Sequence, residues 1–98
     1  MESDNLKQLL DALIDFLENS EDVQKAQYLI NELKKINKHI PTYSKLEELH
    51  KIAVDLDVQY DSFNDLLYYF DPLYAMIERV IHEEEVKKIR QENKEKKL

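Results

Sequence analysis

Glycine and cysteine are both absent from this chain of 98 residues, and proline occurs only twice, at Pro41 and Pro72. Without glycine, the chain lacks the phosphate-binding loops that need close backbone approach, and it lacks the usual residue that ends a helix. Without cysteine, it can form no disulfide, thiol nucleophile or thiolate metal site. Glycine-dependent hairpin turns are excluded as well. Helices joined by short polar connections are therefore the expected architecture.

Long apolar runs are also missing, since no segment approaches the roughly 20 residues needed to span a bilayer. The first residues, MESDNLKQLL, are acidic where a secretory signal would be basic. A hydrophobic fraction of 43% beside a charged fraction of 36% is typical of a soluble globular chain. We therefore expect a cytoplasmic protein with no membrane span.

Apolar residues recur at spacings of three and four along the first half of the chain, which predicts amphipathic helices. The first helix is expected over residues 4–18. A second should follow a cap at Ser20, bury an apolar stripe that runs from Val23 to Ile40, and end before Pro41.

The third helix is predicted to begin at Lys45, because SKLE (residues 44–47) matches a capping box in which Ser44 would be the N-cap. The segment VDLDVQYD (residues 54–61) then alternates apolar and polar residues as a strand does. No other segment alternates and could pair with it. We interpret it as the end of a helix that continues into an ordered connection.

Ser62 is predicted to cap the last helix, whose apolar stripe keeps its phase across Pro72 as far as Ile81. Either one long helix kinks at this proline, or Asp71 caps a new helix with proline at its first position. The stripe then stops, so residues 82–98 are expected to form a charged helical tail. The predicted fold is all-α: a small antiparallel bundle of four to five helices over residues 1–81, with a long, partly free C-terminal helix.

Three partial metal motifs are present, and none is complete. Glu47 and His50 form a single E-x-x-H, whereas helical di-iron sites need two copies and further glutamates. HEEEV (residues 82–86) has Val86 where a zinc protease has its second histidine. DLDVQYD has Tyr60 where a calcium loop requires glycine. We therefore predict no metal, no cofactor and no enzymatic activity.

Acidic and aromatic residues are concentrated together in one window. Residues 1–81 hold sixteen acids and eight bases, whereas residues 82–98 hold five acids and six bases. Between Lys51 and Arg79 there is no Lys or Arg, yet six of the nine aromatic residues fall there. Direct nucleic-acid binding needs clustered bases, so it is not expected.

Within that window, Tyr68 falls on the outer face of the last helix and Tyr69 on its flank. Two interpretations stay open: Tyr68 lies against another helix or in water, or the tyrosine pair binds a partner. We call the predicted binding residues the acidic-aromatic surface; they are Asp61, Asp65, Tyr68, Tyr69 and Asp71. Tyrosine is enriched at interface hot spots, and surrounding acids steer a basic partner.

The segment DLLYYFDP (residues 65–72) resembles the Asp–aliphatic pair–Tyr–Tyr–Pro segment of the immunity proteins that block nuclease colicins. The resemblance covers about eight residues, and two extra residues precede the proline here. It implies that Asp65, Tyr68 and Tyr69 contact a basic toxin without touching its active centre. In size and in its charged tail, the chain also resembles the immunity proteins that protect Gram-positive producers from their own pore-directed bacteriocins.

The predicted function is therefore that of a non-enzymatic immunity or inhibitor protein whose partner is a protein with a basic surface. One alternative is a phage- or mobile-element-encoded inhibitor of a nucleic-acid enzyme that imitates nucleic acid. Another is a chaperone-like or structural helical module that forms a homodimer through its last helix. Val86 and Ile89 are the residues that would carry that dimer contact.

Overall fold

A computed structural model describes residues 2–96 of the chain, with side chains for residues 5–90. It contains four α-helices and two short 3-10 helices, and no strand occurs in this range: α1 (Glu2–Glu18), η1 (Val23–Ala26), α2 (Gln27–Ile36), α3 (Tyr43–Gln59), η2 (Asp61–Phe63) and α4 (Leu66–Lys96). The all-α class is confirmed. The segment that alternates like a strand belongs to α3 up to Gln59, as expected.

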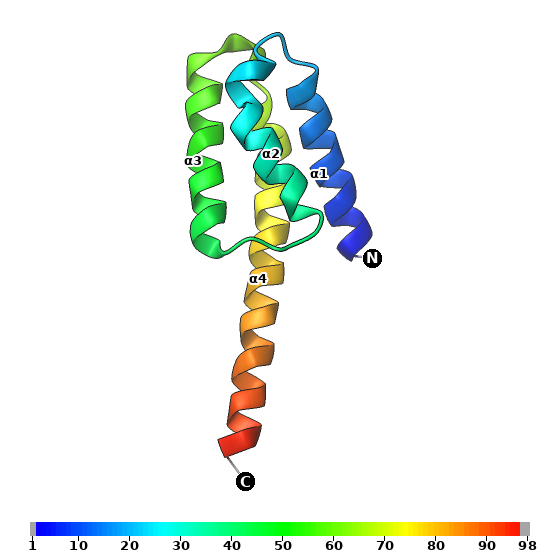
Figure 1. Cartoon of the computed structure of the whole chain (residues 1–98), viewed down its shortest axis with the longest axis vertical. Helices are drawn as coiled ribbons and strands as arrows, with labels where there is room; N and C mark the ends of the chain where they lie inside the picture. The colour runs from blue at the N-terminus through cyan, green and yellow to red at the C-terminus, as the bar shows by residue number, and fades with distance from the viewer. Residues whose placement is uncertain (1, 97–98) are drawn as a thin grey trace.

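The helices lie side by side, and the second half of α4 extends beyond the others (Figure 1). This extension gives the molecule its elongated dimensions of 59 × 25 × 19 Å. One apolar core joins all four α-helices, and its largest fully buried side chains are Phe63, Phe70, Leu10, Leu13, Leu17, Leu29, Ile30, Leu33, Leu46, Leu49, Leu66 and Leu73. Burial of such side chains stabilises the fold by about 1.5–3 kcal/mol each.

The second predicted helix is shorter than expected at both ends. Residues after Ser20 form a turn and then η1, and regular α-helix begins only at Gln27. At the other end α2 stops at Ile36, so Ile40 lies in the α2–α3 connection with 40% of its surface exposed. Pro41 accounts only for the geometry of Ile40, because a proline disfavours helical geometry in the residue before it, and it does not explain why α2 already ends at Ile36.

The two predicted serine caps of the later helices are wrong. Thr42, not Ser44, is the N-cap of α3, and its hydroxyl accepts a hydrogen bond from the Lys45 amide at 3.1 Å. Ser62 does not cap α4. Its hydroxyl instead donates to Asp22 Oδ2 at 2.6 Å and accepts from the Ser20 hydroxyl at 3.0 Å. A tertiary hydrogen-bond network therefore takes the place of the predicted local cap.

The last helix is continuous through Pro72, which lies inside α4 with its side chain exposed. Of the two alternatives left open by the sequence, the single long helix is therefore correct, and Asp71 starts no new helix. Because proline has no amide hydrogen, the carbonyl of Tyr68 loses its helical partner at this point. The predicted tail continues the same helix as far as Lys96, and residues 97–98 lie outside the described part.

Candidate functional site

Tyr68 and Tyr69 follow each other in the first turn of α4 but have different environments. Tyr68 is 79% exposed, whereas Tyr69 is partly buried and packs against the core. The ring of Tyr69 stacks on Phe16 of α1, with centroids 4.8 Å apart and an interplanar angle of 27°. Tyr68 meets Tyr69 edge to face, at 5.6 Å and 87°. The exposed ring is therefore held against α1 through two successive aromatic contacts.

An open groove of about 610 Å³ lies beside this tyrosine pair, between α1 and α4. The wall from α1 is apolar and consists of Leu9 and Ala12. The wall from α4 combines the two tyrosines with Leu67, Asp71 and Pro72. An apolar groove that carries a tyrosine hydroxyl and a carboxylate at its edge is suited to a side chain with an apolar stem and a basic end.

The structure brings together three of the five predicted binding residues. Tyr68, Tyr69 and Asp71 line the same groove, whereas Asp61 lies in η2 and Asp65 immediately precedes α4. All three aspartates are exposed. The carboxylate of Asp71 also lies 3.6 Å from Nε2 of His50 on α3, which makes an ion pair only when that histidine is protonated.

The contribution of α1 to the groove is not among the features predicted from the sequence. Residues 8–24 contain no Lys or Arg, just as residues 52–78 contain none. Because α1 packs against α4, these two base-free segments become neighbours in space. The exposed carboxylates of Asp11 and Asp15 therefore belong to the helix that forms the second wall of the groove. The absence of bases in residues 8–24 was a signal in the sequence that could have indicated this.

A cluster of paired charges lies on a different face, between α2 and α3. The ammonium of Lys45 lies 2.7 Å from Glu48, 3.3 Å from Glu32 and 5.7 Å from the ring centre of Tyr28. Hydrogen bonds to Glu48, Tyr28 and Glu32 raise the pKa of Lys45. Tyr28 thus projects from a face with paired charges, in contrast to Tyr68.

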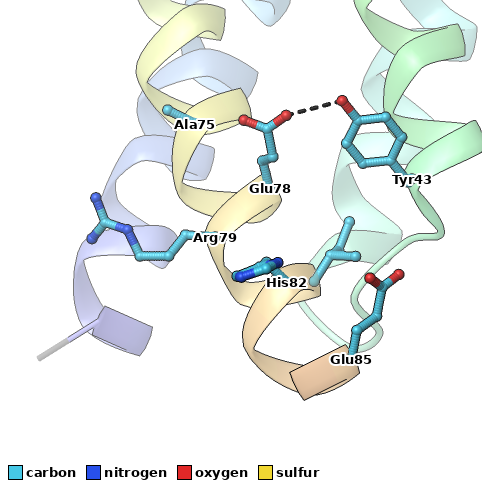
Figure 2. Close-up of a pocket in the computed structure, with 7 residues that line it drawn as sticks. Tyr43, Ala75, Glu78, Arg79, His82 and Glu85 are labelled. Atoms are coloured by element: carbon cyan, nitrogen blue, oxygen red, sulfur yellow. Dashed lines mark hydrogen bonds between the residues drawn. The ribbon is translucent and has the colours of Figure 1, made fainter. Parts of the chain in front are cut away.

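A second pocket lies where α4 leaves the bundle, and Tyr43, Glu78, His82 and Glu85 are among its lining residues (Figure 2). The Tyr43 hydroxyl donates a hydrogen bond of 2.9 Å to Glu78. Hydrogen bonds to Tyr74 and Glu78 raise the pKa of Tyr43, so its phenol remains a neutral donor. This contact joins the start of α3 to the middle of α4.

The histidine of the E-x-x-H motif, His50, serves other contacts. The imidazole of His50 lies 5.7 Å from the ring of Phe70 and 5.1 Å from that of Tyr74, at the edge of the core. Across the described side chains, no group of three or more His, Cys, Asp and Glu residues is arranged to hold a metal. None of the described helices combines the length and apolar character needed to cross a bilayer.

Comparisons with protein-family models, with curated proteins and with solved structures found no match to this chain.

Proposed function

We propose that this protein is a non-enzymatic binding protein of the immunity or inhibitor type, which neutralises a basic protein partner through its acidic-aromatic surface. In this proposal the four α-helices form a small antiparallel bundle that holds the surface rigid. The partner is a protein rather than a nucleic acid, because phosphates would be repelled by a surface that carries acids and no bases.

The exposure of Tyr68 carries this proposal. A tyrosine side chain that is 79% exposed buries little on folding, so it contributes little to the stability of the monomer. Its ring nevertheless meets that of Tyr69 edge to face. A tyrosine side chain has only two rotatable side-chain bonds, so it loses little entropy when it binds, and it offers both apolar area and a hydroxyl. These are the properties of an interface hot spot.

Charge supports the same partner. Residues 8–24 and 52–78, which supply the two walls of the groove, contain acids and no Lys or Arg. Such a surface attracts a basic protein from a distance and raises the association rate at low salt. The resemblance of residues 65–72 to the nuclease-colicin immunity segment assigns the same role to Asp65, Tyr68 and Tyr69.

Site-specific photo-crosslinking tests the proposal. A benzophenone amino acid replaces Tyr68 in the protein expressed in its native cells. The matched control carries the same amino acid in place of Tyr28, which is 49% exposed and lies on α2 beside paired charges. We expect one basic protein to be crosslinked from position 68 and not from position 28. The same products from both positions, or an acidic product from position 68, would argue against the proposal.

A further inference from the structure

The outward face of α4 carries a regular row of residues that the bundle does not cover. Successive members are four and three residues apart, which is the spacing of a coiled-coil seam. We call this row the outer seam; it consists of Tyr68, Pro72, Ala75, His82, Val86 and Ile89, with Arg79 at the remaining position. All are exposed except Val86, which is half-buried.

The outer seam is long and mostly apolar. From Tyr68 to Ile89 it spans about 30 Å at roughly 1.5 Å per residue. Ile89 is 56% exposed and belongs to the second half of α4. That half extends beyond the other helices (Figure 1). Figure 2 shows Ala75, Arg79 and His82 along α4 in the middle of this row, with Glu78 directed toward Tyr43.

One edge of the outer seam is acidic throughout. Asp71, Glu78 and Glu85 each precede a seam residue by one position and repeat every seven residues, so they form a single line along the helix. All three residues are exposed, although Asp71 also lies 3.6 Å from His50 and Glu78 accepts the hydrogen bond from Tyr43. In a helix pair, residues at this edge face the flanking residues of the partner helix and select them by charge.

This acidic edge disfavours a second copy of the chain. In an antiparallel pair of copies, the line of Asp71, Glu78 and Glu85 would face the same three acids. In a parallel pair, Glu78 would face Glu83 of the second copy, and only Glu85 would meet a base, Arg90. The predicted homodimer through Val86 and Ile89 is therefore not the arrangement that the charges favour.

We propose that the basic partner presents an amphipathic helix to the outer seam, with apolar residues at its own seam and Lys or Arg along the edge that faces Asp71, Glu78 and Glu85. This inference rests on the proposed function and adds to it the form of the partner. The bound helix would begin beside Tyr68 and continue past the end of the bundle to Ile89. The extended half of α4 would then be part of the binding surface.

A synthetic probe tests this inference without knowledge of the natural partner. The probe is a three-heptad helical peptide with Leu and Ile at its seam and Lys on both flanks, and mutual repulsion of the lysines keeps it from pairing with itself. Two control peptides are a version with Glu on both flanks and a Lys version with the same composition in shuffled order. We expect only the ordered Lys peptide to bind, with an affinity that falls as salt rises.

Matched variants locate the bound peptide. We expect Ile89→Ser and Glu85→Lys to weaken binding at least about tenfold. Two control variants should leave the affinity within about twofold. Val58→Ser changes an apolar residue of α3 that is 79% exposed. Glu84→Lys makes the same charge change as Glu85→Lys, but on the opposite side of α4. Equal binding of ordered and shuffled peptides, or equal effects of Glu84→Lys and Glu85→Lys, would overturn the inference by showing a bulk charge effect.

Two further results separate this inference from the proposed function. If Tyr68→Ala abolishes binding of the natural partner identified by crosslinking but Ile89→Ser does not, the proposed function stands and the part of the outer seam beyond the groove is not used. If sedimentation shows a stable dimer of the chain that Ile89→Ser dissociates, the seam belongs to a second copy and the inference is wrong.

Discussion

Tyr68 and Tyr69 are adjacent in the sequence but differ in how much the folded chain depends on them. Tyr69→Ala removes a ring that stacks on Phe16 and packs against the core, so we expect a loss of about 2 kcal/mol in the free energy of unfolding. Tyr68→Ala should stay within about 0.5 kcal/mol of the wild type, as exposed changes usually do. Urea denaturation of both variants measures the difference. Equal losses would mean that Tyr68 belongs to the core.

The carboxylate of Glu32 links the stability of the fold to pH. A hydrogen bond from Lys35, together with Lys45, lowers the pKa of Glu32 below its ordinary value of 4.5. The charged carboxylate is therefore favoured by folding. This stabilisation is fully present above about pH 4.5 and is lost as the pH falls through the lower pKa of the folded chain.

Replacing that carboxylate should reduce the sensitivity to acid. We expect Glu32→Gln to lose less stability than the wild type between about pH 7 and about pH 3, because the group that titrates is gone. Glu47→Gln makes the same change of charge at an exposed position of α3 and serves as the control. Unfolding curves at several pH values give the comparison. A slope for Glu32→Gln that equals that of the wild type would contradict the assigned ion pairs.

At the scale of the helices, the start of α3 depends on one hydroxyl. Thr42 accepts the Lys45 amide hydrogen bond, whereas Ser44 already lies within the helix. Thr42→Ala should therefore cost about 1 kcal/mol of stability, and Ser44→Ala only a few tenths. The two variants can be compared by thermal unfolding. A larger effect at Ser44 would indicate that the capping box predicted from the sequence is the one that forms.

Pro72 weakens α4 at the point where the helix carries the tyrosine pair. Pro72→Ala restores an amide hydrogen that can bond to the Tyr68 carbonyl, so we expect a gain of about 1–2 kcal/mol. The gain is smaller than the full helical penalty of proline, because alanine also frees the unfolded chain. Urea unfolding measures it. A loss of stability instead would show that α4 needs the geometry imposed by proline.

The helices themselves could be predicted from the sequence, because apolar spacing reports directly which face is buried. Leu10, Leu13 and Leu17 are fully buried on one face of α1, as the spacing of three and four indicates. The caps could not be predicted so well. Serine and threonine have similar capping preferences, and the choice of Thr42 over Ser44 depends on how the connection from Pro41 enters the helix. Ser62 was assigned a local cap because its partners, Ser20 and Asp22, are distant in the sequence.

At the scale of the whole molecule, the tyrosines and acids of α4 could be identified from the sequence, but their neighbours could not. The exposure of Tyr68 follows from its angle on the helix. Its neighbour Tyr69 stacks on Phe16, and this contact requires the packing of α1 against α4, which no local pattern reports. The same packing places a second base-free segment, residues 8–24, beside the first. The proposed binding surface is therefore larger than the five residues predicted from the sequence.

The charge of the whole molecule also predicts how a basic partner associates. With a net charge of −7 and base-free segments on both walls of the groove, association should be fast at low salt and slow as salt rises. We expect the rate of association with the free partner, once crosslinking has identified it, to fall at least about tenfold between low and high ionic strength. The dissociation rate should change less. Stopped-flow mixing gives both rates. An association rate independent of salt would show that the acids take no part.

The central claim is that Tyr68 is the anchor through which this protein neutralises a basic partner. The most direct measurement uses the partner that crosslinking identifies, purified in its free form. Its activity is measured in the presence of the wild type, Tyr68→Ala or the exposed control Tyr28→Ala. We expect Tyr68→Ala to require at least about a hundredfold more protein for the same inhibition, in line with a hot-spot loss, and Tyr28→Ala to match the wild type. Full inhibition by Tyr68→Ala at wild-type concentrations would contradict the account.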